Sequence, residues 1–258
     1  MVKQVRLGKS DVNVFPIALG TNAVGGHNLY PNLDEEQGKE VVRQAIDNGI
    51  TLLDTAYIYG PERSEELVGQ VVKEYPREKV QIATKGSHVI KENEEVVQNN
   101  DPEYLKQQVE NSLERLQVDY IDLYYIHFPD DDTPKDKAYA AENNITFVPY
   151  FPLASGILAG KYDENQTFED HRAERPDFQP DVFKDNVRRV KALTDIAEAH
   201  DTTIANVVLA FYLTRPSLDV VIPGAKRAEQ VVENIDAANI ELSQGEIDKI
   251  DSLFPIKK

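Results

Sequence analysis

Short apolar segments alternate along the chain with longer amphipathic segments. The short segments are apolar on both faces, as strands covered by helices are, and they predict core strands at 15–19, 51–54, 80–84, 120–127, 146–150 and 220–222. The longer segments carry apolar residues at helical spacing, and they predict helices at 34–48, 64–75, 102–116, 183–200, 203–214, 228–238 and 244–254. Because strands and helices alternate, we expect parallel strands joined by right-handed crossovers.

Local signals mark several ends of these elements. Asp101 followed by Pro102 is typical of an N-cap with proline at the first helical position, and Ser243 predicts the cap of the last helix. The segment VRLGKSDVNVFPI (5–17) predicts a small hairpin that turns at 8–10 and leads into the first core strand.

One predicted connection departs from this pattern. Residues 130–144 must join the strand that ends at His127 to the strand that begins at Thr146, yet Tyr139 is the only large side chain available for an inner face. Every other connecting helix carries three or four large aliphatic residues. A helix without an apolar stripe has little to hold it against a sheet, so we expect a short and partly exposed helix here.

Polar residues gather at the C-terminal ends of the predicted strands. They are Thr21, Asn22, Asp54, Lys85, His127 and the segment 151–155. In a (β/α) barrel this end carries the chemistry, and a doubly wound sheet also binds ligands there. The dinucleotide fingerprint GxGxxG does not follow the first strand, which weakens the doubly wound alternative. We therefore expect a TIM-type (β/α) barrel.

Four of the polar residues form a candidate catalytic group: Asp54, Tyr59, Lys85 and His127. Each alone is more often structural than functional, but an acid, a phenol, a cation and an imidazole at one rim indicate a site. A lysine beside a tyrosine favours the phenolate, so we expect the pKa of Tyr59 to fall below its usual value near ~10. The group suits proton transfer to a carbonyl oxygen while another molecule supplies hydride.

Two further segments are candidates for binding a phosphorylated ligand. In VVIPGAKRAEQVVENI, Lys226 and Arg227 stand at the start of a helix, which suits a phosphate and favours a 2′-phosphate over a free ribose hydroxyl. In TFVPYFPLASGILAGKY, Tyr150 could stack on a flat ring, and Gly156 and Gly160 would let the backbone approach a pyrophosphate. The alternatives are a basic surface loop and a turn-rich connection.

Taken together, the motifs are similar to those of a known family. The stretches DTAYIYG, IATKG, DYIDLYYIHFPD, FVPYFPLASGILAGKY and IPGAKRAEQVVENI follow one another as in the aldo-keto reductase family, which the chain resembles. The closest resemblance is to the bacterial branch that is also similar to the β-subunits of voltage-gated potassium channels. It implies an eight-stranded barrel with two additional helices, here 183–200 and 244–254. It also implies that Tyr59 donates the proton, with Lys85 as the partner that lowers its pKa.

The resemblance further implies NADPH as the cofactor, bound in an extended form without a Rossmann fold. Its nicotinamide end would lie beside Gly20, Thr21, Asn22 and Asp54, with Tyr150 stacked on the ring. The segment around its pyrophosphate would comprise Phe151, Pro152, Leu153, Ala154, Ser155, Lys161 and Arg172. The adenosine 2′-phosphate end would be held by Gly224, Lys226, Arg227, Gln230, Glu233 and Asn234.

The chain also departs from the family pattern. It has six recognisable core strands where the family has eight, and it lacks the segments of the fifth and sixth units that hold the nicotinamide carboxamide. The start of the fourth helix (133–138) runs directly into what resembles the end of the sixth (139–144). Two missing units correspond to roughly 60 residues. We expect one barrel domain over 1–258, incomplete or distorted, with a deletion junction near 133–144.

Composition limits the partners. The 28 basic and 45 acidic residues give a net charge of −17, which disfavours nucleic acid and anionic membranes. Without cysteine, an export signal or a long apolar segment, the chain is expected to be cytoplasmic. Only His127 of the five histidines ends a strand, so a metal-dependent hydrolase is not expected.

These observations predict NADPH-dependent reduction of aldehydes or ketones to alcohols, with a small-molecule carbonyl as substrate. The alternative is a nucleotide-binding regulatory or catalytically impaired relative that acts as a redox sensor or interaction module. The substrate and the oligomeric state stay open.

Overall fold

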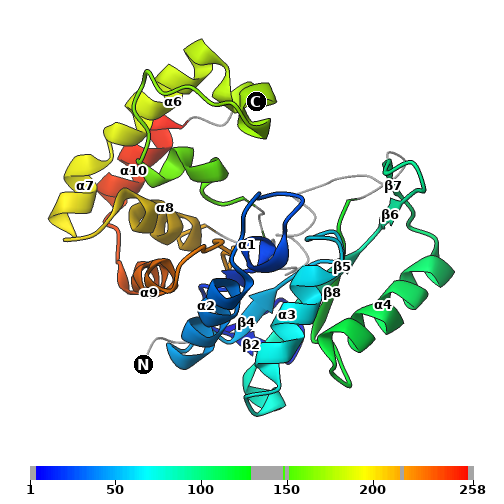
Figure 1. Cartoon of the computed structure of the whole chain (residues 1–258). Coiled ribbons are helices and arrows are strands. Elements are labelled where there is room, and N and C mark those ends of the chain that lie inside the picture. Colours follow the sequence, from blue (N-terminus) through cyan, green and yellow to red (C-terminus); the bar gives the residue numbers. More distant parts are fainter. Residues whose placement is uncertain (1–3, 129–147, 149–150, 216–217, 255–258) are drawn as a thin grey trace.

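The computed structural model describes residues 4–128, 148, 151–215 and 218–254. A short parallel sheet lies under a layer of helices, and a second group of helices stands beside it (Figure 1). The predicted strand at 146–150, the predicted helix at 130–144, the junction near 133–144 and Tyr150 lie outside the described residues.

The central sheet is parallel and contains four strands in the order β3 (Leu19–Gly20), β4 (Leu52–Asp54), β5 (Gln81–Gly86) and β8 (Leu123–Ile126). Isolated parallel bridges join Ile17 to Val221 and Gly20 to Gly224, so the segment around 220–224 runs along the outer side of β3. The α/β class and the parallel arrangement are therefore confirmed. The predicted strand at 220–222 is wrong as a regular strand, because its pairing is confined to single bridges.

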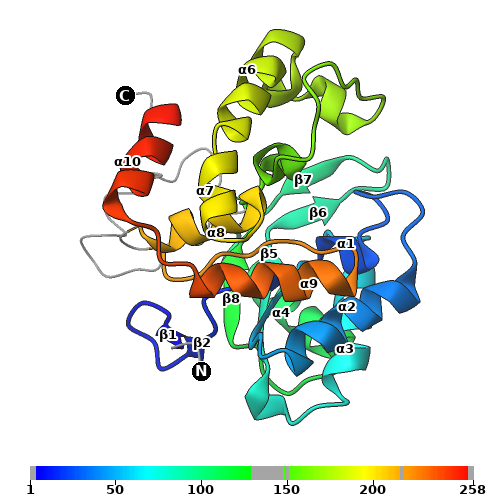
Figure 2. The ribbon, with the colours of Figure 1, turned by 90° about the vertical axis from the view of Figure 1, so that its left-hand side faces the viewer.

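Helices α2 (Glu35–Asp47), α3 (Arg63–Val72), α4 (Pro102–Leu116) and α9 (Ala228–Asp236) form the outer layer. Neighbours in this layer are α9 with α2, α2 with α3, and α3 with α4, which is the order of the strands they follow. Figure 2 shows α9 beside α2. An apolar cluster lies between the helices and the sheet, and it includes Val41, Leu53, Leu67, Ile82 and Val231. The predicted caps of α4 and α10 (Gln244–Leu253) are confirmed, since Asp101 and Ser243 accept hydrogen bonds from the first-turn amides.

The second group of helices contains α6 (Pro180–Lys191), α7 (Thr194–Ala199), α8 (Ile204–Leu213) and α10. The single helix predicted at 183–200 is wrong, because the chain breaks between α6 and α7. The Thr194 hydroxyl donates to the Lys191 carbonyl at 2.7 Å, and the Leu193 amide bonds to Val190, three residues back. These local bonds replace the regular helical ladder and allow Leu193 to be fully buried.

Two hairpins flank the sheet. The predicted N-terminal hairpin is present as β1 (Val5–Arg6) paired with β2 (Asn13–Val14). A second hairpin, β6 (His88–Ile90) with β7 (Val96–Gln98), follows β5 and was not predicted. The remaining short elements are α1 (Asn22–Gly25), η1 (Arg77–Lys79), η2 (Ala154–Ala159), η3 (His171–Glu174), η4 (Pro176–Phe178) and η5 (Ala237–Asn239).

The inner side of the sheet is only partly enclosed. A small apolar cluster there contains Leu52, Ala83 and Val220, with Leu123 and Tyr125 of β8 partly buried against it. Within the described ranges, β8 pairs with β5 alone, and Ile126 is 54% exposed. Among the described residues β8 therefore has one strand neighbour, β5, and the described core strands do not form a closed barrel.

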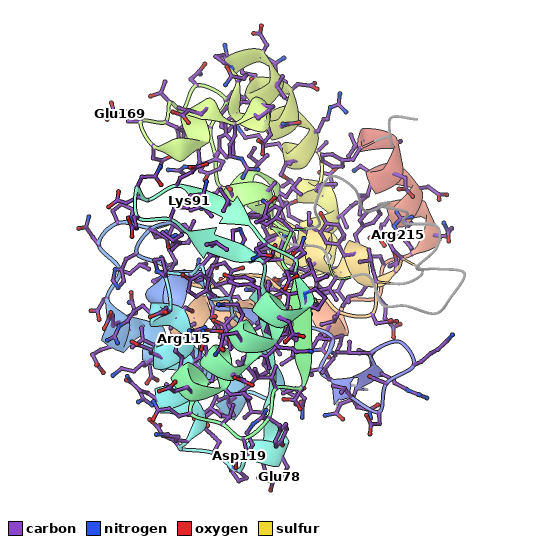
Figure 3. The ribbon with its side chains drawn as sticks, turned by 90° about the vertical axis from the view of Figure 1, so that its right-hand side faces the viewer. Glu78, Lys91, Arg115, Asp119, Glu169 and Arg215 are labelled. Atoms are coloured by element: carbon purple, nitrogen blue, oxygen red, sulfur yellow. The ribbon has the colours of Figure 1, made fainter. Side chains whose placement is uncertain are left out.

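A buried carboxylate joins α3 to the sheet and to α4. Glu65 is fully buried, and it accepts hydrogen bonds from Thr84 Oγ1 of β5 at 2.6 Å and from Arg115 Nε of α4 at 2.5 Å. Figure 3 labels Arg115 on α4, beside the sheet. Through Thr84, the residue before Lys85, Glu65 thus ties β5 to α3, and through Arg115 it ties α3 to α4.

Candidate active site

Lys85 is the centre of a group of polar side chains at the C-terminal ends of β4 and β5. Its ammonium donates to Asp54 Oδ1 at 2.6 Å, to the Thr55 carbonyl at 2.7 Å and to the Tyr59 hydroxyl at 3.3 Å. An ammonium has three donors, and all three are used here. The Lys85 and Asp54 side chains are 11% and 8% exposed, so the pair is largely removed from water.

His127 completes the group from the next strand. It follows β8, and its backbone amide donates to the Gly86 carbonyl at 3.0 Å, which continues the pairing of β8 with β5. The His127 ring stands edge-on to the Tyr59 ring, with 5.9 Å between the centroids. The structure therefore brings together all four residues that the sequence predicted as catalytic.

Burial and charge set the protonation of this group. Burial lowers the pKa of Lys85, but the Asp54 carboxylate and the Tyr59 hydroxyl raise it by more, so the pKa lies above its usual value and the ammonium stays charged. Burial raises the pKa of Tyr59, and the opposing effect of Lys85 is smaller. The expectation of a net lowered Tyr59 pKa is therefore wrong for this structure, because desolvation of the phenolate outweighs the cation.

His127 is a neutral imidazole at physiological pH. Burial, followed by the charges of Lys85 and His88, lowers its pKa to about 3. Its Nδ1 is buried, as are Asp54 Oδ2 and the Tyr125 hydroxyl, and none of these three atoms has a hydrogen-bond partner among the described residues. Buried polar atoms normally have partners, so these three atoms leave unused hydrogen-bonding capacity beside the catalytic candidates.

Sequence reasoning did not identify His88, which lies beside His127. His88 is 8% exposed, and the two imidazole rings meet edge to face with 4.6 Å between their centroids. The Tyr104 hydroxyl donates to the His88 carbonyl at 2.5 Å and fixes the start of β6. The signal available in the sequence was the spacing of His88, three residues after Lys85 in the loop that follows a predicted strand.

The predicted nicotinamide-end residues lie next to this group. Thr21 is fully buried, and its amide and hydroxyl both donate to the Asp54 carbonyl, at 2.9 and 3.0 Å. Gly20 bridges to Gly224, and a Cβ added to Gly224 would meet Asn22 Oδ1 at 2.9 Å. The fold therefore brings segments from opposite ends of the chain into contact, at Gly20, Asn22 and Gly224.

The loop that begins at Phe151 has an unusual backbone. Phe151, Ala154 and Ser155 have positive φ angles of 52°, 46° and 53°, although none is glycine. Gly156 follows with φ 94°, and a Cβ there would meet Lys161 Cε at 2.3 Å. Such strained residues cluster at ligand sites, and they turn successive amides of this loop in unusual directions. In contrast, Leu153 packs into two apolar clusters, and Pro152 is buried.

Three cations from separate segments, Lys161, Arg172 and Lys226, lie near enough to influence one another. Burial lowers the pKa of Lys226, and the positive charges of Lys161 and Arg172 lower it further, which places the three charges in one field. Arg172 also donates to the Tyr162 hydroxyl at 2.8 Å and pairs with Asp170. A concentration of positive charge in a chain of net charge −17 favours an anionic ligand.

The other predicted residues of this end have structural roles or lie at the surface. Gln230 Oε1 accepts from the backbone amides of Lys226 and Arg227, at 2.9 and 3.2 Å, and so caps α9. Asn234 is 9% exposed, whereas Arg227 and Glu233 are exposed beside it.

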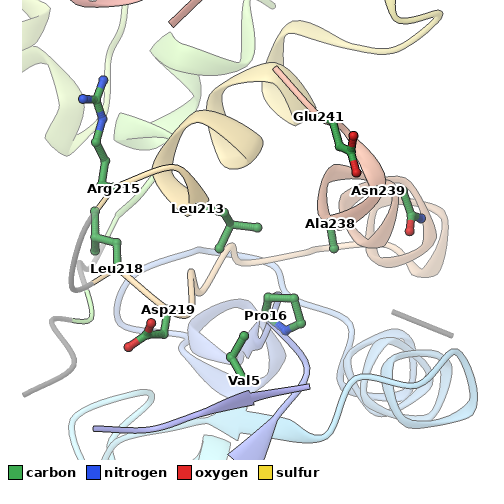
Figure 4. A pocket seen from close by; sticks show the side chains of 9 residues that line it. All are labelled: Val5, Pro16, Leu213, Arg215, Leu218, Asp219, Ala238, Asn239 and Glu241. Atoms are coloured by element: carbon green, nitrogen blue, oxygen red, sulfur yellow. The ribbon is translucent and has the colours of Figure 1, made fainter. Parts of the chain in front are cut away.

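Other possible sites are less developed. No group of three or more metal-binding side chains occurs in the part of the chain that the structure describes. None of the described helices is long and apolar enough to cross a membrane. A hollow of about 430 Å³ lies at the opposite, N-terminal end of the sheet, where Val5 and Pro16 face Leu213 and Ala238 (Figure 4).

Comparison with known proteins identifies the family. A model of the aldo/keto reductase family matches residues 16–141 and 135–254. The chain belongs to the aldo/keto reductase family. Its sequence is 31% identical over 274 aligned positions to the aldo-keto reductase YhdN of Bacillus subtilis, covering 83% of this chain and 82% of that protein. This finding, together with the sheet, confirms the predicted family and its barrel fold class.

Other relatives differ in function. Over 324 positions, 24% are identical to a probable voltage-gated potassium channel β-subunit of Arabidopsis thaliana, covering 97% of this chain and 96% of that one. The NADH-specific methylglyoxal reductase of Escherichia coli is 27% identical over 313 positions, covering 95% of this chain and 96% of that protein. The aldo-keto reductase yakc of Schizosaccharomyces pombe, which is named for NADP(+), is 29% identical over 295 positions, covering 90% of this chain and 87% of that protein. Among solved structures, the glycerol dehydrogenase of Gluconobacter oxydans superimposes with a TM-score of 0.86 at 26% identity, covering 97% of this chain and 94% of that one.

Proposed function

We propose that this protein reduces aldehyde or ketone carbonyls to alcohols with NADPH, and that Tyr59 supplies the proton. The observation that carries the proposal is the Lys85 ammonium, which bonds to Asp54 at 2.6 Å and to Tyr59 at 3.3 Å beside the neutral His127. Membership of an oxidoreductase family that acts on carbonyl compounds supports the same reaction. The substrate class is a small-molecule carbonyl.

The four side chains divide the work of proton transfer. The Tyr59 hydroxyl accepts from Lys85, and no acceptor for its own proton lies among the described residues, so that proton is available to a carbonyl oxygen. Lys85 then stabilises the phenolate that forms, and Asp54 keeps the ammonium charged and oriented. His127, held neutral, can donate a second hydrogen bond to the same oxygen. NADPH would supply the hydride.

Several features fit a bound dinucleotide. The unpartnered atoms Asp54 Oδ2 and His127 Nδ1 lie where a polar ligand would end, and the approach of Gly224 to Asn22 leaves no room for a side chain. At the other end, Lys226 provides positive charge for a 2′-phosphate, and Lys161 and Arg172, which would hold the pyrophosphate, add to the same positive field. We infer NADPH from these cations, although the relatives include proteins named for each of the two cofactors.

The missing units bear on activity. We propose that residues 1–258 form one barrel domain that lacks the fifth and sixth units, with the junction near 133–144. The alignment with YhdN of Bacillus subtilis is 274 positions long but includes only 83% of this 258-residue chain, so YhdN has about 60 residues there that this chain lacks. The two matches to the family model overlap at residues 135–141, which is where the junction is proposed. A nicotinamide without its carboxamide partners would be held less firmly, which supports the alternative of a regulatory or catalytically impaired nucleotide binder. The similarity to a channel β-subunit favours the same alternative.

A titration followed by turnover distinguishes these functions. NADPH fluorescence is followed as protein is added, and an aromatic aldehyde is then supplied. Binding followed by oxidation supports the reductase, whereas binding without oxidation supports the regulatory relative. Absence of binding would exclude both. Tyr59→Phe is the matched control, since it keeps the ring and should lower the rate by about 10²- to 10⁴-fold while NADPH still binds. On the acidic, cysteine-free composition we further propose that the protein acts in the cytoplasm.

A further inference from the structure

Tyr30 lies on the loop between α1 and α2 and connects the two ends of the proposed cofactor site. Its hydroxyl accepts a hydrogen bond from Asn22 Nδ2 at 3.3 Å, beside the predicted nicotinamide end. The face of its ring contacts the Lys226 ammonium, with 4.0 Å between Nζ and the ring centroid, at the phosphate end. No other aromatic ring lies as close to Lys226 among the described residues.

Backbone and Asn28 contacts, independent of Lys226, hold the loop that carries this ring. The Tyr30 amide donates to the Gly26 carbonyl at 3.0 Å. The neighbouring Asn28 donates to the Ile58 carbonyl at 3.0 Å and accepts from the Gly60 amide at 2.8 Å. The loop is therefore tied at several points to the segment after β4, and it presents Tyr30 as a fixed surface.

Lys226, in contrast, has little else to hold it. Its side chain is exposed, and no carboxylate lies within ion-pair distance of its ammonium in the described part of the chain. The nearby charges of Lys161 and Arg172 repel it, and Asp170, whose charge opposes theirs, is already bound by Arg172. A lysine side chain has many rotamers, so an aromatic face that fixes the ammonium reduces the entropy lost when an anion binds.

We propose that Tyr30 is a positioning residue that holds Lys226 for the 2′-phosphate and so contributes to the choice of NADPH over NADH. This inference rests on the proposed cofactor site. Tyr30 does not touch the reacting atoms, and its effect is exerted through the lysine. The ring supports one side of the ammonium, which leaves the other side open to a phosphate.

The test compares dissociation constants for NADPH and NADH, measured by fluorescence, in three proteins. Tyr30→Leu removes the aromatic face and should weaken NADPH binding about two- to fivefold, the range of an exposed cation–π contact, with less than a twofold change for NADH. Tyr30→Phe keeps the face and loses only the bond to Asn22, so its NADPH-to-NADH ratio should equal that of the wild type. In a Lys226→Met background, Tyr30→Leu should have no further effect on NADPH.

Each contrary result is informative. Equal weakening for NADPH and NADH, or an effect of Tyr30→Leu that persists without Lys226, would overturn the inference and assign Tyr30 to the loop alone. Thermal unfolding of each variant identifies a protein that has lost its fold. Adenosine 2′,5′-bisphosphate separates this inference from the proposed function, because it carries the 2′-phosphate without a nicotinamide. Should the bisphosphate bind with the predicted Tyr30 dependence while NADPH is not oxidised, the inference stands and the reductase activity does not.

Discussion

Replacing Lys85 with methionine leaves the Asp54 carboxylate in a largely buried site without its counter-ion. The two side chains are 11% and 8% exposed, and the pair is joined at 2.6 Å. Removing one partner of a buried pair typically costs about 3 to 5 kcal/mol of unfolding free energy, because the remaining charge stays desolvated. For a chain of this size that corresponds to a fall in melting temperature on the order of 10 °C.

The pH dependence of this loss has a definite sign. In Lys85→Met, burial without a cation raises the pKa of Asp54 above its value near ~4 in the unfolded chain. The folded protein then binds more protons than the unfolded chain above that pH, so stability falls as pH rises. We expect the variant to approach the wild type near about pH 4 and to differ most at neutral pH.

Thermal melting followed by circular dichroism from pH 4 to pH 8 provides the assay. The matched control is the double variant Lys85→Met with Asp54→Asn, which removes the charge and should recover a large part of the lost stability. If Lys85→Met melts with the wild type at every pH, or if adding Asp54→Asn recovers nothing, then the pair is not buried as described and the reasoning fails.

Three further predictions concern other parts of the molecule. Glu65→Gln should lower the unfolding free energy by about 3 kcal/mol, because it leaves Arg115 without its buried partner, and adding Arg115→Met should recover part of it in urea unfolding. Because the pKa of His127 is about 3, the pH profile of kcat/KM should show no histidine titration between about pH 5 and 8, and such a step would contradict the neutral imidazole. Gly156→Ala forces a side chain at φ 94° against Lys161, so it should reduce thermal stability by about 1 kcal/mol or more and weaken NADPH binding, whereas an unchanged titration would separate the loop from the cofactor.

The sequence predicted the parts of this fold whose signals are local. The apolar run before Lys85 became β5, and the Asp101–Pro102 pair became the first turn of α4. The predictions that were wrong depended on contacts between residues that are distant in the sequence. The break after Lys191 follows from the burial of Leu193 against α8 and α10, and the raised pKa of Tyr59 follows from burial that no sequence pattern measures.

The residues of the candidate site also separate into those with a local sequence signal and those without one. The four catalytic candidates could be predicted because each ends a strand or follows one closely, and parallel strands bring such ends together. Tyr30 could not, since it follows no predicted strand and its partner Lys226 is met only in the folded chain, whereas His88 had a weak signal in its spacing from Lys85.

The bridge between Gly20 and Gly224 has a consequence for synthesis of the chain. It joins segments about 200 residues apart, a separation that slows the formation of such contacts. The ribosome releases Gly20 long before Gly224 exists, so β3 can pair with β4 well before its second neighbour is available. Asn22 and Gly224 can meet only after Gly224 has left the exit tunnel. A nascent chain stalled before Gly224 should therefore lack the contact between Gly224 and Asn22, although the β4–β5 pair and Lys85 could already be in place.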